Sequence, residues 1–78
     1  MTEVEIEYCV PCGLLDRAEE MQHNLLQQFG QRLDRVALVT GENGVLRVTV
    51  DGERVWDKSE DEYDPDLVLR RVRSHVSP

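Results

Sequence analysis

The sequence predicts an α+β domain in which a four-stranded mixed sheet combines with two helices in the order β-α-β-β-β-α. Three observations support this prediction. The first residues alternate between apolar and acidic side chains, the next segment repeats its apolar residues at helical spacing, and an Asp-Gly pair separates two later β-rich runs. Since the chain has 78 residues, we expect a single domain spanning residues 1–78 with a thin apolar core.

The first predicted strand is the alternating segment EVEIEY, residues 3–8. Val4, Ile6 and Tyr8 are expected on one face and the intervening glutamates on the other, because successive side chains of a strand point to opposite faces. The apolar face is expected to turn toward the core.

A helix is predicted after Cys12, where the spacing of apolar residues changes to three and four. Pro11 suits the first turn of this helix, because its missing N–H would have no partner there. Gly30 is a natural end. The expected buried stripe consists of Leu14, Ala18, Met21, Leu25 and Phe29.

Three further strands are expected at residues 32–40, 45–50 and 53–56. The segment GENG forms the turn between the first two of them. Asp51-Gly52 separates the last two and is a strong signal for a two-residue hairpin. Trp56, a lone aromatic residue on the last strand, is expected to serve packing.

A final helix is predicted from about Asp64-Pro65 to about His75, with Asp64 as its cap. The acidic run before it, residues 57–66, is expected to be a solvated connection. The whole order matches a minimal thioredoxin-like domain, with its first two strands parallel and its last three antiparallel. A ferredoxin-like fold is the main competitor, but it needs a helix where this chain has only Asp51-Gly52.

The only two cysteines, Cys9 and Cys12, fall where the first strand gives way to the first helix. A Cys-x-x-Cys pair at such a junction in a cytosolic chain indicates a redox motif. The positive end of a helix lowers the pKa of a thiol, whereas the acidic neighbours of this pair raise it. The residues alone leave open which effect dominates.

Two other interpretations of Cys9 and Cys12 stay open. A structural zinc site needs four ligands, and His23 and His75 lack finger-like spacing to the pair, although a dimer sharing two pairs would supply enough sulfur. Alternatively, both cysteines are inert core residues. We expect neither a metal nor an organic cofactor.

The composition restricts the partners and the location. The formal net charge of −7 repels phosphate backbones and anionic lipid, so nucleic-acid and membrane roles are not expected. The N-terminal residues lack the basic and apolar regions of a secretory signal, so we expect a cytoplasmic protein. Lys58 is the only lysine against eight arginines, a bias that favours a halophilic archaeon as the source over an ordinary acidic bacterial protein.

The segment VEIEYCVPCGLLDRAEEMQHNLLQQFG resembles the selenoprotein W-like, or Rdx, family. Members open with a strand that ends in an aromatic residue before Cys-x-x-Cys-Gly or its selenocysteine form, and a long helix follows. The later segment LVTGENGVLRVTVDGERVWDK resembles the family's glycine, strand and hairpin. The resemblance covers nearly the whole chain, and it implies a thioredoxin-like fold with a thiol oxidoreductase role.

The resemblance also implies a division of labour between the cysteines. Selenium-containing members carry selenocysteine at the position of Cys12, which implies that Cys12 attacks and Cys9 resolves. Thioredoxins assign these roles in the opposite order. They also place a cis-proline before the third strand, which this sequence lacks.

We therefore predict a small thiol–disulfide oxidoreductase or redox carrier with Cys9 and Cys12 as its catalytic residues. Val10, Pro11 and Gly13 are expected to line the approach of the substrate. The expected partners are protein or small-molecule thiols and disulfides together with a separate reductant, and we expect a monomer. The alternative is a non-catalytic interaction module whose cysteine pair senses redox state or is inert.

Overall fold

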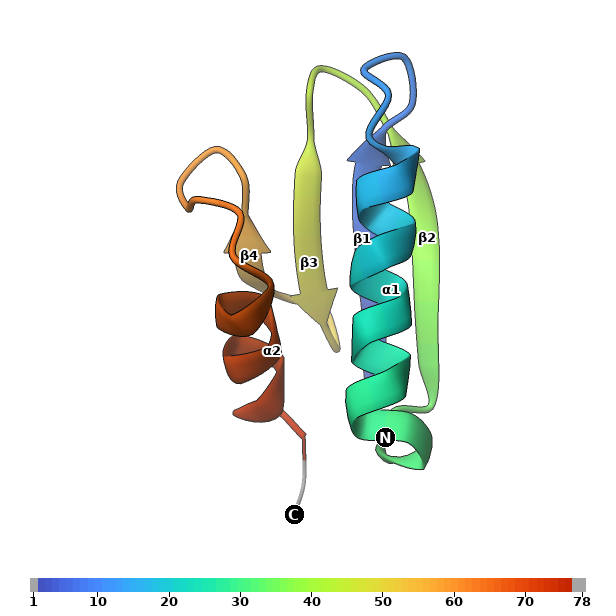
Figure 1. Ribbon diagram of the computed structural model, residues 1–78, viewed down its shortest axis with the longest axis vertical. Coiled ribbons are helices and arrows are strands. Elements are labelled where there is room, and N and C mark those ends of the chain that lie inside the picture. The colour runs from blue at the N-terminus through green and yellow to red at the C-terminus, as the bar shows by residue number, and fades with distance from the viewer. Residues whose placement is uncertain (1, 77–78) are drawn as a thin grey trace.

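The computed structural model describes residues 2–76, so Met1 and the last two residues of the predicted domain lie outside the described residues. A short 3-10 turn, η1, follows the first helix, and the remaining elements keep the predicted order. The prediction of a thioredoxin-like α+β fold is confirmed (Figure 1). The elements are β1 (Glu3–Cys9), α1 (Leu15–Phe29), η1 (Gly30–Arg32), β2 (Arg35–Gly41), β3 (Leu46–Val50), β4 (Glu53–Asp57) and α2 (Pro65–Arg73).

The four strands form one mixed sheet in the order β2-β1-β3-β4 (Figure 1). β1 runs parallel to β2, with Val4 opposite Val36, and antiparallel to β3. β3 and β4 form the predicted hairpin, in which φ is 51° at Asp51 and 85° at Gly52. Positive φ at both central residues is what a type I′ turn requires. β1, which ends at Cys9, is therefore a central strand with a neighbour on each side.

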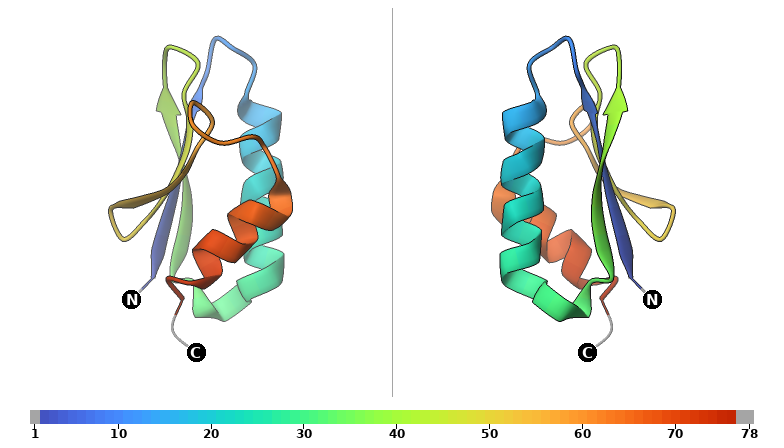
Figure 2. Two further views of the ribbon diagram at one scale, coloured as in Figure 1. Left: turned by 90° about the vertical axis from the view of Figure 1, so that its left-hand side faces the viewer. Right: turned by 90° about the vertical axis from the view of Figure 1, so that its right-hand side faces the viewer.

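Both helices pack on one face of the sheet and leave the other face uncovered (Figure 2). Burial follows the predicted periodicities, because Val4 and Ile6 of β1 are inaccessible to solvent and Tyr8 is nearly so. The predicted stripe of α1 is buried as well, except that Leu14 is only partly buried. The core thus lies between the helices and the inner face of the sheet, and the glutamates of β1 occupy the outer face.

The start of β2 and the end of α2 differ from the prediction. β2 begins at Arg35 rather than at residue 32, because residues 30–32 form η1, which reverses the chain direction. α2 ends at Arg73 rather than at about His75, since the chain continues in turns with hydrogen bonds to the third residue back. The predicted cap is confirmed: the Asp64 side chain accepts a hydrogen bond from the backbone N–H of Asp66 at 3.0 Å.

The acidic segment before α2 is more than a solvated connection. Tyr63 packs edge-on against Trp56, with ring centroids 6.0 Å apart, and its hydroxyl donates to Glu20 of α1 at 2.7 Å. Trp56 is 1% exposed and donates its indole N–H to the carbonyl of Glu62. The predicted packing role of Trp56 is confirmed, and its ring anchors this segment to the core.

Candidate functional site

The two cysteines lie in a loop, residues 9–14, that joins β1 to α1 and is called the cysteine loop below. Cys9 is the last residue of β1, and its backbone N–H donates to the carbonyl of Val45 at 2.8 Å. The N–H of Val10 donates to the carbonyl of Gly41 at 3.2 Å. These two hydrogen bonds attach the start of the loop to the end of β2 and to the residue before β3, on the two sides of β1.

The prediction that Pro11 lies in the first turn of the helix is wrong. The chain forms a turn at residues 10–13, and α1 begins only at Leu15. The physical reason is Gly13, whose φ of +76° is left-handed and cannot continue a right-handed helix. A Cβ atom at Gly13 would meet no atom within 4 Å, so this glycine serves backbone conformation rather than close approach.

Cys9 and Cys12 are joined by a disulfide, with their Cα atoms 5.4 Å apart. Their exposure differs sharply, since Cys9 is 0% exposed whereas Cys12 is exposed to solvent. The loop therefore presents one sulfur-bearing residue to an incoming molecule and keeps the other covered. This asymmetry is a property of the fold, because Cys9 belongs to a central strand and Cys12 to a surface turn.

Exposed apolar residues flank the exposed cysteine in the sequence. Val10 is 50% exposed and Leu15, the first residue of α1, is 44% exposed. Pro11 lies in the same turn and is exposed too. Exposed apolar side chains close in sequence to an exposed cysteine can contact a partner without any rearrangement of the core.

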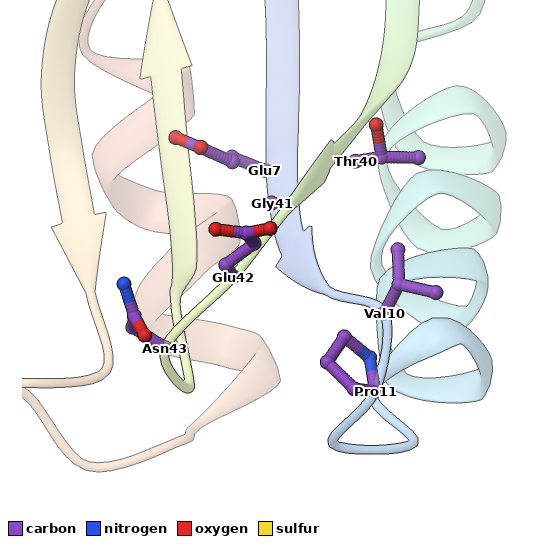
Figure 3. Close-up of a pocket in the computed structure, with 7 residues that line it drawn as sticks. All are labelled: Glu7, Val10, Pro11, Thr40, Gly41, Glu42 and Asn43. Carbon is purple, nitrogen blue, oxygen red and sulfur yellow. The ribbon is translucent and has the colours of Figure 1, made fainter.

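A groove of about 660 Å³ lies beside the cysteine loop on the helix-free face of the sheet. Figure 3 shows Val10 and Pro11 on one side of it and the carboxylates of Glu7 and Glu42 on the other, with the helices behind the sheet. The structure thus places two of the three predicted approach residues, Val10 and Pro11, in this groove, and Gly13 does not line it. Its lining residues are Glu7, Val10, Pro11, Thr40, Gly41, Glu42 and Asn43.

A buried carboxylate supports the groove from the far side of β3. Asp57 is 4% exposed and accepts hydrogen bonds from Arg47, Arg54 and Ser59. Burial raises its pKa, but the two hydrogen bonds from Ser59 and the guanidinium of Arg47 outweigh burial, so the pKa falls from 3.8 to about 2. Arg47 also reaches Glu7 at 3.3 Å, so Asp57 holds the arginine that positions a groove carboxylate.

Sequence reasoning missed this network of Asp57 and its partners. The sequence feature that could have indicated the network is the presence of Arg47 and Asp57 on paired strands. A regular two-residue hairpin, however, would place Trp56 rather than Asp57 opposite Arg47. The irregularity between Val48 and Thr49 shifts the register by one residue, so that Trp56 faces Val48 in the core and Asp57 faces Arg47.

The alternatives of a metal site and a membrane span concern the described residues, 2–76. In that range, no three or more His, Cys, Asp or Glu side chains are grouped so that they could hold a metal ion. Within the same residues, neither helix is both long and apolar enough to cross a bilayer. His23 is exposed on α1, and His75 contacts Glu53 at 3.6 Å.

Comparison with known proteins gives consistent results. The model of the Rdx family matches residues 3–74. A crystal structure of a protein from Bordetella parapertussis is 36% identical and superposes with a TM-score of 0.91, covering 96% of this chain and 98% of that one. A selenoprotein W-related protein from Vibrio cholerae shares the fold at 23% identity, with a TM-score of 0.89 and coverage of 97% and 98%. No curated protein sequence matches the chain.

Proposed function

We propose, from the premise that this chain belongs to the Rdx family, that it is a thiol–disulfide oxidoreductase or redox carrier acting through Cys9 and Cys12. The observation that carries the proposal is the bonded pair with one covered and one exposed member at the end of a central strand. Reversible exchange needs two cysteines within bonding reach and one of them open to another molecule. The cysteine loop meets both requirements.

The proposed reduction of a substrate disulfide has two steps. The Cys12 thiolate attacks one sulfur of the substrate, forming a mixed disulfide and releasing the first substrate thiolate. The Cys9 thiolate then attacks the Cys12 sulfur, which releases the second substrate thiolate and closes the Cys9–Cys12 disulfide. The substrate gains two electrons and the protein loses two, which a separate dithiol reductant returns by the same exchange in reverse.

Exposure supports Cys12 as the attacking residue. A substrate sulfur must approach the attacked or attacking sulfur in line with the S–S bond, so access limits the choice. Cys9 is fully covered and Cys12 is open. The position of selenocysteine in the selenium-containing relatives supports the same order, which is opposite to that of thioredoxins.

Trapping with single-cysteine variants tests the proposal. Cys9→Ser leaves an exposed thiolate without a resolving partner, so we expect it to accumulate mixed disulfides with a disulfide substrate. Cys12→Ser leaves only the covered Cys9 and should trap far less. Equal trapping by both variants would contradict the assigned order, and trapping by neither would contradict exchange itself.

A redox titration of the parent protein separates the carrier from the non-catalytic module. A carrier is expected to titrate reversibly as a two-electron couple between roughly −300 and −180 mV. An inert pair gives no reversible couple in this range. A pair that titrates but fails to exchange with any disulfide substrate would indicate a sensor.

We propose a cytoplasmic location and adaptation to high salt on the basis of composition. The net charge of −7 and the single lysine support this proposal. Screening of like charges should then stabilise the protein, so we expect the free energy of unfolding to rise between low and molar KCl. A free energy that falls with KCl would contradict the adaptation.

A further inference from the structure

The groove beside the cysteine loop has a fixed position relative to the disulfide. One wall of the groove is the cysteine loop, through Val10 and Pro11, and the other wall is the turn between β2 and β3. The hydrogen bonds from Cys9 to Val45 and from Val10 to Gly41 connect the two walls directly. A molecule that reaches Cys12 across Val10 and Pro11 therefore passes over the groove.

The Glu7 carboxylate is held in this groove by Arg47 and lies over Gly41. Arg47, itself anchored by Asp57, contacts one carboxylate oxygen of Glu7 at 3.3 Å. The other oxygen lies only 2.9 Å from the point where a Cβ atom at residue 41 would stand. The φ of Gly41 is not positive, so the glycine serves space rather than conformation, and that space is shared by the Glu7 carboxylate and the Val45 side chain, whose Cγ1 atom lies 2.7 Å from the same point.

Glu42 adds a second carboxylate to the groove. Its side chain is exposed and forms no ion pair within residues 2–76. The lining of this first cavity contains two carboxylates and no basic side chain, whereas the adjoining second cavity adds Arg47, Lys58 and Asp57. Across both cavities the carboxylates of Glu7, Glu42 and Asp57 outnumber the cations of Arg47 and Lys58 by one, so the trough keeps a net negative charge, which favours cations and repels anions.

We propose that the groove selects partner polypeptides in which an arginine or lysine lies next to the reactive cysteine. This inference rests on the proposed exchange function and names its substrate class. A polypeptide fits because the groove continues into a second cavity of about 400 Å³ that shares Glu7, Glu42 and Asn43. The combined trough extends across the sheet face, so it offers room for several residues, and Val10 supplies apolar contact.

Matched peptides test the preference. Three peptides differ only in the residue after cysteine, which is Arg, Gln or Glu, and each is oxidised to a symmetrical disulfide-linked dimer. Reduced protein is mixed with each dimer, and chromatography measures the peptide thiol that is released. At low ionic strength we expect the Arg peptide to react roughly tenfold faster than the Glu peptide, with Gln between them. Near ~1 M salt the ratio should approach one, because the Debye length falls to about 3 Å.

Two variants with the same change in net charge locate the effect. Glu42→Gln removes the unpaired groove charge and should reduce the Arg-to-Glu ratio to about threefold. Glu3→Gln removes a carboxylate at the opposite end of β1, about 20 Å away along the strand, and should leave the ratio unchanged. The two variants differ in position and not in overall charge.

Each outcome has a definite meaning. Equal rates for the three peptides, or a faster Glu peptide, would overturn the inference while leaving the proposed exchange function intact. Equal losses in Glu42→Gln and Glu3→Gln would overturn it too, since the overall charge and not the groove would then be responsible. If no peptide reacts with the parent protein, both the exchange function and the inference fail.

Discussion

Two loops at the same end of the sheet are held in opposite ways (Figure 1). The loop between β4 and α2, residues 58–64, is anchored by side chains: Asp57 binds Ser59, Arg71 binds Asp61, and Tyr63 packs on Trp56. The cysteine loop is held by backbone hydrogen bonds and the disulfide. One loop commits its side chains to the fold, and the other leaves them available to a partner.

This difference makes the two loops respond differently to substitution. Changes in the anchored loop should reduce stability, because its side chains fill the core or satisfy buried charge. Changes in the cysteine loop should reduce exchange with partners at little cost in stability, unless they alter the backbone itself. The following expectations test this division from the largest effect to the smallest.

The largest effect is expected for Asp57→Asn. The change removes a buried charge that satisfies Arg47, Arg54 and Ser59. We expect the free energy of unfolding, measured by urea denaturation, to fall by about 2–4 kcal/mol. Glu62→Gln, an exposed change in the same segment, should cost under about 0.5 kcal/mol. Equal costs for the two variants would contradict the anchoring role.

Acid should remove the same stabilisation in the parent protein. The pKa of Asp57 is about 2 in the folded state against an ordinary 3.8. Because the folded pKa is depressed, the unfolded chain binds the proton more readily. The stabilisation, about 2 kcal/mol, is therefore present above pH ~4 and is lost as pH falls through ~2. The difference in unfolding free energy between parent and Asp57→Asn should shrink over this window; a constant difference would contradict the assignment.

The sequence predicted the periodic part of the molecule and missed the part set by register. Val4 and Ile6 alternate, and the α1 stripe repeats at helical spacing, so burial follows directly from local pattern. The Asp57 network depends instead on a one-residue shift between β3 and β4 that no local pattern reveals. The end of the first strand beside Cys9 was predicted. The late start of α1 was not predicted, because it depends on the left-handed conformation of Gly13.

An intermediate effect is expected for Gly13→Ala, which changes the backbone of the cysteine loop. A Cβ atom there meets nothing within 4 Å, so the only cost is the left-handed conformation at φ +76°, about 1 kcal/mol in unfolding free energy. Gly52→Ala, at φ +85° in the hairpin at the opposite end of the sheet, should cost a similar amount. Only Gly13→Ala should also slow disulfide exchange, and an equal change in rate for both would contradict a local role.

The smallest effect on stability, and the clearest separation of the two loops, is expected for Val10→Ala. Half of this side chain is already exposed, so its truncation should change the unfolding free energy by no more than about 0.5 kcal/mol. Contact with a protein partner would bury the exposed half, so kcat/KM for a protein disulfide should fall about fivefold, while the rate with a small disulfide should stay unchanged. Leu26→Ala provides the matched control, because Leu26 is 44% exposed but lies near the far end of α1. If Leu26→Ala slows the protein reaction as much as Val10→Ala does, the cysteine loop is not the contact surface, and the contrast between an anchored loop and a docking loop fails.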